Sequence, residues 1–312
     1  MTLKSKPAAS DKYEMVSNKI LQLLEQDIVP WRKPWFATPY MNLVGGNLYS
    51  GRNPLYCAID CMINGWHESF FVGFNQGKKI GWQLAKGSKS TWIRFGGTGS
   101  KEVEDKETGK LEKQFYGMHK WHNVFHVSCW DDSDSDVKKV ELIAKHGDKF
   151  PQTLLTEPKP QELQQFIDAQ GAVVSHGGDR CFYSSSRDEI RMAPYESFSS
   201  ADAYYAVHVH ELGHWTGHKG RLARDMGGAQ GSVQYAKEEL VAEFTSAFVC
   251  NQLGIESRME QHASYIDSWK KIIKADGKAV FKAMDLATIA ADLLLSNAGL
   301  VVKENKKELV AA

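Results

Sequence analysis

The sequence predicts an α+β protein of two domains, with a mixed α/β domain over residues 1–150 and a mainly helical domain over residues 151–312 that includes a small antiparallel sheet. Its 312 residues exceed the size at which a single hydrophobic core stops growing, roughly 250 to 300 residues. A hydrophobic content of 42% and a charged content of 24% are those of a globular chain. Strand-like and helical patterns are mixed before residue 150, whereas helical patterns dominate after it.

The first expected element is an amphipathic helix at residues 11–28 that ends before Pro30. Its apolar side chains form one stripe: Val16, Ile20, Leu23, Leu24 and Ile28. A short helix is expected at 54–64. Strand-like runs at 91–95 and 115–129 enclose a charged segment, 101–113, that is typical of an exposed hairpin tip.

Two segments resist burial and are predicted to be linkers, the acidic and serine-rich 131–139 and the proline-rich 151–161. We therefore place the domain boundary near residue 150. A helix is expected at about 160–169, followed by three short strands at 172–176, 180–184 and 188–192 and then by helices. The strand at 188–192 is expected at the edge of its sheet, where it could pair with an extended peptide.

The N-terminus and the cysteines predict a cytoplasmic protein without a membrane partner. The first ten residues carry no apolar stretch typical of a signal peptide, and nowhere do 18 apolar residues follow one another. The five cysteines are an odd number at scattered positions, which does not indicate a disulfide framework.

The net charge of zero conceals two oppositely charged halves. Residues 1–130 contain 17 Lys and Arg against 11 Asp and Glu, a balance of +6, and residues 131–312 contain 21 against 27, a balance of −6. Seven of the nine tryptophans lie in the basic half. Cations that track phosphates and rings that stack on bases are typical of proteins that bind single-stranded nucleic acid.

The residues that would contact single-stranded DNA interleave cations with rings: Trp31, Arg32, Lys33, Trp35, Lys78, Lys79, Trp82, Lys86, Lys89 and Arg94. The alternative is that the tryptophans anchor a hydrophobic core and the lysines form a solvated face. Spacing alone does not choose between these two interpretations.

The metal-binding motif of the chain is HExxH, formed by His210, Glu211 and His214. If residues 201–215 are helical, the two histidines project from one face and can bind a single ion. Zn²⁺ suits nitrogen and carboxylate ligands and lowers the pKa of a bound water to roughly 7, although another divalent cation could occupy the site. Glu211 is then placed to accept the proton of that water.

The third metal ligand is expected in the segment 235–248, because the extended motif that would place a histidine at position 220 has Gly220 there instead. If this segment is helical, Glu239 is the third ligand and Glu243 the carboxylate that orients a ligand histidine. Glu238 is the competing third ligand. Three side chains could stabilise developing negative charge: Tyr235, Arg221 and His262.

From Tyr13 to Ile255 the sequence resembles the ArdC antirestriction family of conjugative plasmids. The resemblance lies in PWRKPW at 30–35, FNQGKKIGWQLAKGSKS at 74–90, the passage 171–198, HELGHWTGH at 210–218 and YAKEELVAEF at 235–244. It implies an N-terminal domain that binds single-stranded DNA and a C-terminal zincin-like metallopeptidase domain, in which His210, Glu211, His214 and the glutamates of the last motif hold the metal.

The resemblance also implies that the protein protects incoming plasmid or phage DNA from host restriction. Two other functions remain open on the sequence. One is a non-catalytic protein that shields DNA and has a structural metal. The other is a DNA-associated protease whose substrate is a protein bound to DNA.

Overall fold

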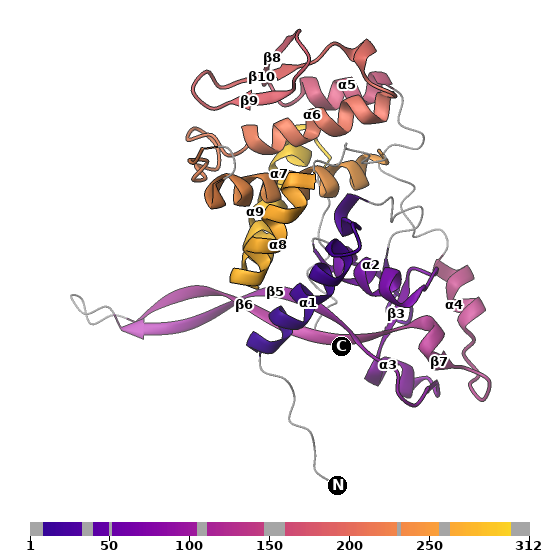
Figure 1. Cartoon of the computed structure of the whole chain (residues 1–312). Coiled ribbons are helices and arrows are strands. Elements are labelled where there is room, and N and C mark those ends of the chain that lie inside the picture. The colour runs from indigo at the N-terminus through magenta and orange to yellow at the C-terminus, as the bar shows by residue number, and fades with distance from the viewer. Residues whose placement is uncertain are drawn as a thin grey trace.

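The structure is a computed structural model that describes residues 9–32, 40–49, 52–104, 111–146, 160–229, 232–255 and 263–300. Within these ranges the fold is α+β with two domains, and the C-terminal half is mainly helical, as the sequence predicts (Figure 1). In Figure 1 the small sheet lies above α6, α7 lies beneath α6, and the N-terminal elements lie below them.

The N-terminal half is built on a five-stranded sheet with the strand order β2-β1-β3-β6-β5. Its strands are β1 (Met41–Asn42), β2 (Asn47–Leu48), β3 (Phe70–Gly73), β5 (Thr91–Glu104) and β6 (Leu111–His126). Strands β1 and β3 are parallel, and the other neighbours are antiparallel. Strands β5 and β6 pair along the whole of β5 and form a ribbon that extends beyond the rest of the molecule (Figure 1). The ribbon is longer than predicted, and the centre of the expected tip, 105–110, lies outside the described residues.

The helices of this half are α1 (Ala9–Leu24), α2 (Asn53–Asn64), α3 (Phe74–Lys79) and α4 (Lys139–His146), with short 3₁₀ turns at Pro30–Arg32 and Val127–Cys129. Helix α1 ends at Leu24 rather than at residue 28. The reason is a left-handed Asp27 (φ 56°), after which the Ile28 amide donates to the carbonyl of Leu23 and closes the helix.

Residues 131–139 do not form a linker, which corrects the sequence prediction. Asp131 belongs to β7 (Trp130–Asp131), which pairs with β4 (Gln83–Leu84). Ser135 is buried, and its hydroxyl donates to the carbonyl of Ile80 at 2.5 Å. Short polar side chains therefore satisfy the backbone of an ordered turn here, a role that composition does not distinguish from a flexible linker.

The small sheet of the C-terminal half is mixed rather than wholly antiparallel. It follows α5 (Pro160–Asp168) and consists of β8 (Val173–His176), β9 (Phe182–Ser184) and β10 (Glu189–Met192) in the order β8-β10-β9. Strand β10 is parallel to β8 and antiparallel to β9. After β8 the chain forms β9 at the opposite edge of the sheet and then returns to form β10 between β8 and β9. Residues 188–192 are therefore in the central strand and not at the predicted edge.

The remaining helices are α6 (Ala201–Trp215), α7 (Val233–Leu253), α8 (Ala263–Ala275) and α9 (Ala279–Asn297), with a 3₁₀ turn at Tyr195–Ser197 before α6. Ser200 and Ser232 cap α6 and α7 by accepting hydrogen bonds from the amides of Ala203 and Tyr235. Among the described helices, none is both long and apolar enough to cross a membrane.

One hydrophobic core crosses the predicted domain boundary. Its buried side chains come from the first two helices and the turn between them, and from α7, α8 and α9: Val16, Ile20, Leu23, Leu24, Val29, Trp31, Leu55, Tyr56, Ile59, Leu240, Val241, Phe244, Ile266, Trp269, Ile273, Val280, Phe281, Ala283, Met284 and Ala287. A second core joins α5, α6, β10 and the end of α7. Helix α7 therefore contributes to both.

His208 is a buried histidine on α6 that forms no hydrogen bond within the described residues. Its ring meets that of Tyr204 edge to face. Burial and, to a smaller extent, the charge of His176 lower the pKa of His208 to about 4, although Asp168 opposes the shift. The imidazole of His208 is therefore neutral in the folded protein near neutral pH.

We expect the free energy of unfolding to fall by up to about 3 kcal/mol as the pH drops from about 6.5 to 4. Over this range the unfolded chain takes up a proton at His208 and the folded chain does not. Urea unfolding of the wild type and of His208→Gln at several pH values measures this difference. If the difference in free energy of unfolding between the two proteins did not vary between pH 4 and 7, the lowered pKa of His208 would be contradicted.

Candidate metal centre

The metal centre lies where α6 and α7 pack against each other at very close range. A Cβ atom added to Gly213 would lie 3.1 Å from Cα of Ala242 and 3.3 Å from its carbonyl oxygen. Only a glycine fits at this position without moving one of the helices. Gly213 thus sets the distance between α6, which carries the HExxH motif, and α7, which carries the glutamates.

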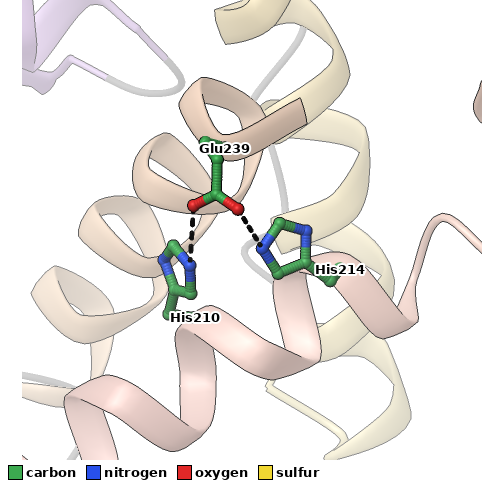
Figure 2. A group of neighbouring side chains, drawn as sticks. All are labelled: His210, His214 and Glu239. Atoms are coloured by element: carbon green, nitrogen blue, oxygen red, sulfur yellow. Dashed lines mark ion pairs between the residues drawn. The ribbon is translucent and has the colours of Figure 1, made fainter. Parts of the chain in front are cut away.

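Three side chains converge across this contact (Figure 2). His210 and His214 project from α6, and Glu239 of α7 lies between them, with 3.6 Å from Nε2 of His210 to Oε2 and 3.5 Å from Nε2 of His214 to Oε1. One ligand atom from each residue lies within 4.8 Å of the other two. A tetrahedral ion with bonds near 2.1 Å separates its ligands by about 3.4 Å. The donor set therefore fits a divalent cation.

The charges of the three residues agree with this interpretation. Burial lowers the pKa of His210, but the neighbouring carboxylates of Glu239, Glu211 and Glu243 outweigh burial and raise it to about 9. Burial raises the pKa of Glu239, and hydrogen bonds from His210 and Tyr235 together with the charge of His214 lower it to about 2. The buried carboxylates thus favour a positive charge between the two histidines. A metal cation supplies this charge when it replaces the proton on the imidazole.

Glu211 is buried on the same helix, one residue after the first histidine. Burial raises the pKa of Glu211, whereas the two histidines and a hydrogen bond from the backbone N–H of Tyr183 oppose the shift. Tyr183 lies in β9, an edge strand of the small sheet. The strand that faces the centre is thus β9, not β10. A carboxylate with a raised pKa is suited to accept and return a proton near neutral pH.

The second nitrogen of His214 contacts Glu238. Nδ1 of His214 lies 3.3 Å from Oε1 of Glu238, and Arg224 donates to both oxygens of that carboxylate. The orienting contact that the sequence assigned to Glu243 is therefore made by Glu238. Glu243 is buried and lies within electrostatic reach of His210, but Nδ1 of His210 forms no hydrogen bond in the described part of the chain. Glu238 itself does not lie between the two histidines.

The predicted stabilisers of negative charge have different surroundings. Tyr235 donates a hydrogen bond to the carboxylate of Glu239 and so lies at the centre. Arg221 stacks on the ring of Trp215 and pairs with Asp188, which commits its guanidinium elsewhere. His262 lies outside the described residues.

Two of the tryptophans predicted to stack on DNA bases are core residues, which corrects the prediction. Trp31 is 2% exposed and packs against Phe244 and Trp269. Trp82 is 1% exposed and donates its indole N–H to the carbonyl of Val137 at 2.7 Å. Neither ring has a free face on which a base could stack.

Arg94 is also buried, with an exposure of 7%, and its guanidinium lies over the ring of Tyr13. Its nearest carboxylate is Asp285, 3.8 Å away. It is therefore not free to track a phosphate. The backbone of Arg32 ends a short 3₁₀ turn, while Lys33 and Trp35 lie outside the described residues.

The four predicted lysines are exposed and lie on and after α3: Lys78, Lys79, Lys86 and Lys89. Phe74 lies beside them with 44% exposure, and Nζ of Lys78 is 6.0 Å from its ring centroid. Phe74 was not among the predicted stacking residues, because the pattern of cations and tryptophans does not include it. Exposed Asp131 and Asp134 are close by, since Gln83 pairs with the first and bonds to the second. The lysines and Phe74 are called the lysine patch below.

Two family models match the chain and define its class. Residues 10–125 match the N-terminal domain of the anti-restriction factor ArdC, and residues 161–286 match a zincin-like metallopeptidase domain. The protein thus combines an ArdC-type N-terminal domain with a zincin-like domain, and the three converging residues lie in the second match.

The chain belongs to the ArdC antirestriction family. Its structure superposes on the metal-free crystal structure of the antirestriction protein ArdC from plasmid R388 with a TM-score of 0.68 and 31% identity, over 94% of this chain and 100% of that one. The Mn(II)-bound structure of that protein gives the same TM-score with 30% identity, over 92% and 97% of the two chains. A divalent metal in the zincin-like domain agrees with the donor set described above.

Other relatives are longer or uncharacterised. Two DNA primases named TraC from Escherichia coli are each 32% identical over 91% of this chain, which spans only 20% and 27% of their lengths. An uncharacterised protein of Sinorhizobium fredii, y4eC, is 28% identical over 91% of both chains.

We expect Gly213→Ala to lower the affinity for a divalent cation about tenfold. The added methyl group must push the backbone of α7 away by a few tenths of an ångström, and overpacking of this kind typically costs about 1 to 3 kcal/mol. Metal content and chelator competition on the purified protein measure the effect. His210→Ala, which removes a ligand, serves as the reference for a disabled site.

Ala242→Gly is the matched control, because it removes atoms from the same helix contact. It should cost about 1 kcal/mol of helix stability and leave metal content near that of the wild type. Equal metal affinities of Gly213→Ala and the wild type would show that the helix spacing does not govern the site.

Proposed function

We propose that this chain is an antirestriction protein that binds single-stranded DNA through its N-terminal half and carries a zinc-dependent, peptidase-like centre at His210, His214 and Glu239, with Glu211 as its base. In this proposal it protects incoming plasmid or phage DNA in the cytoplasm. The observation that carries it is the convergence of two imidazoles and a carboxylate at distances that fit one ion, beside a buried glutamate.

The chemistry of the centre follows from the residues around it. A bound divalent cation would polarise a carbonyl group and make a bound water acidic. Glu211 would accept a proton from the attacking water and later deliver it to the leaving amine, for which its raised pKa is suited. Tyr235 holds Glu239 by a hydrogen bond and so keeps this carboxylate directed at the two histidines. The edge of β9 lies beside Glu211 and offers backbone groups to an extended peptide.

A protein bound to DNA is the substrate class that joins the two halves in this proposal. The N-terminal half would hold the single strand, and the centre would act on a polypeptide near it. One hydrophobic core contains side chains of both halves, so that a strand and a polypeptide would be held on the same rigid body.

Glu211→Gln tests whether catalysis is needed for protection. The substitution keeps the size of the side chain and removes the proton acceptor, so any peptidase turnover should fall by roughly 10² to 10⁴. The measurement is the survival of unmodified plasmid DNA that enters a restricting host, with metal content and DNA affinity checked in parallel. Glu196→Gln, on an exposed turn, is the matched control.

Loss of protection in Glu211→Gln, with metal and DNA binding intact, supports a catalytic role. Full protection would support the other class of function, in which the protein shields DNA and its metal is structural. Because the side chain keeps its size, no folding defect is expected. A defect would be recognised by a fall in metal content.

The lysine patch is the part of the N-terminal half that we propose for binding phosphates. Replacement of its four lysines by alanine should weaken binding to single-stranded oligonucleotides, because each phosphate that is no longer neutralised keeps its counterion. The slope of log affinity against log salt should shrink by about 0.7 for each such phosphate. Phe74→Ala should weaken binding without altering the slope, since stacking releases no counterions.

Alanine at Lys271, Lys274, Lys278 and Lys282 is the matched control, because these lysines are exposed, equal in number and located on and between α8 and α9. Gel shifts over a series of salt concentrations compare the two variants. An equal loss of affinity in both would show that overall charge, and not the patch, governs binding. An unchanged affinity in the patch variant would place the DNA elsewhere.

A further inference from the structure

A loop after α6 folds back on the metal centre and places Arg224 behind it. The backbone amides of Leu222, Ala223 and Arg224 donate to the carbonyls of Thr216, His218 and Gly217, which closes the loop on itself. Arg221 anchors its middle by stacking on Trp215 and pairing with Asp188 at the end of the β9–β10 turn. The loop is thus fixed to both the helix and the sheet.

The path of the loop is shaped to let Arg224 through. Ala223 has a left-handed backbone (φ 48°), which a residue with a side chain adopts only at some cost in free energy. Gly217 leaves room for the guanidinium, since a Cβ atom there would lie 2.8 Å from Nη2 and 3.0 Å from Cζ of Arg224. These two features direct the side chain inward.

The side chain of Arg224 is 4% exposed, and each of its three nitrogens has an acceptor. It donates to Oε2 of Glu238 at 3.1 Å and to Oε1 at 2.6 Å, to the carbonyl of Gly213 at 2.7 Å and to the hydroxyl of Thr216 at 2.7 Å. Two of the acceptor residues lie at the end of α6, and the third, Glu238, lies on α7. Arg224 therefore links the two helices beside His214, which Glu238 contacts.

Glu238 has two possible roles in such a site. It lies next to Glu239 on α7, and a free carboxylate at this depth could swing toward a cation and occupy the open position that a catalytic metal needs for water. In the structure it is instead held between Arg224 and Nδ1 of His214, while Nε2 of His214 faces Glu239. The bidentate contact with a guanidinium fixes this orientation.

We propose that Arg224 is a positioning residue of the metal centre. It holds Glu238 against Nδ1 of His214, which directs Nε2 of that ring to the cation and keeps the carboxylate of Glu238 from becoming a fourth ligand. This inference rests on the proposed metal centre and concerns how the open coordination position is maintained.

The test uses the full chain with Zn²⁺ as the probe. Arg224→Gln should lower the affinity for Zn²⁺ about tenfold, the lower limit for the loss of an orienting partner, as measured by chelator competition. In the Zn²⁺-loaded wild type, NMR should show a slowly exchanging Nδ1–H proton on His214, and this signal should broaden or vanish in Arg224→Gln. Arg224→Lys keeps the charge but cannot hold both oxygens of Glu238, so its effect should be intermediate.

Two further variants separate positioning from folding. If Arg224 acts through Glu238, then adding Arg224→Gln to Glu238→Gln should change the affinity little beyond the single substitution. Arg221→Gln is the matched control, because it removes another anchor of the same loop that does not contact Glu238. It should keep the Nδ1–H signal of His214 and most of the affinity.

The inference is overturned if Arg224→Gln retains both the affinity and the Nδ1–H signal, if its effect is undiminished in the Glu238→Gln background, or if Arg221→Gln causes the same loss. A higher affinity in Arg224→Gln would overturn it as well, because the orienting contact would then not be needed for binding. Failure of the wild type to bind Zn²⁺ would overturn the metal centre itself, whereas the first three outcomes would leave that centre standing.

Discussion

The close contact of α6 with α7 at Gly213 and Ala242 is the constraint on which the rest of the structure depends. Because a glycine faces a backbone here, the two helices approach more closely than side chains would otherwise allow. The carboxylate of Glu239 can then lie within 3.6 Å of one imidazole and 3.5 Å of the other. The same proximity lets Arg224 bridge the end of α6 and the carboxylate of Glu238. A wider spacing would leave three polar side chains buried without a common partner.

Helix α7 connects this contact to two hydrophobic cores of the molecule. Leu240, Val241 and Phe244 of α7 are buried with the first two helices of the chain, and its later residues Val249, Cys250 and Leu253 are buried with α5, α6, β10 and α9. Buried interiors are close-packed, so the rotation of α7 about its axis is set by the cores on its sides. The N-terminal half thus contributes to the geometry of a centre whose residues all lie in the C-terminal half. This shared core also explains why Trp31 belongs to the interior rather than to a DNA-binding surface.

Local sequence pattern was sufficient to predict single helices and strands, but not their arrangement. Residues 201–215 form a helix with the bounds that the sequence analysis assumed, and Ser200 caps its first turn. The predicted strands at 172–176, 180–184 and 188–192 also exist, but their order in the sheet did not follow from the pattern. Strand order depends on which edges the returning chain can reach. The same limit applies to the acidic segment 131–139, in which hydrogen bonds from Ser135 and to Asp132 turn an apparent linker into an ordered connection.

The sequence by itself determined the chemistry that is available: two histidines four residues apart on a helix, a glutamate beside the first and a glutamate-rich helix downstream, together with exposed lysines in a basic half. Only the tertiary structure shows that Glu239, and not Glu238, lies between the two histidines. Neighbouring residues on a helix point about 100° apart, so a rotation of α7 by about that angle would exchange their places. The orientation of α7 about its axis is fixed by the burial of Leu240 and Phe244 in a core that includes segments from the other end of the chain, and no local pattern encodes it.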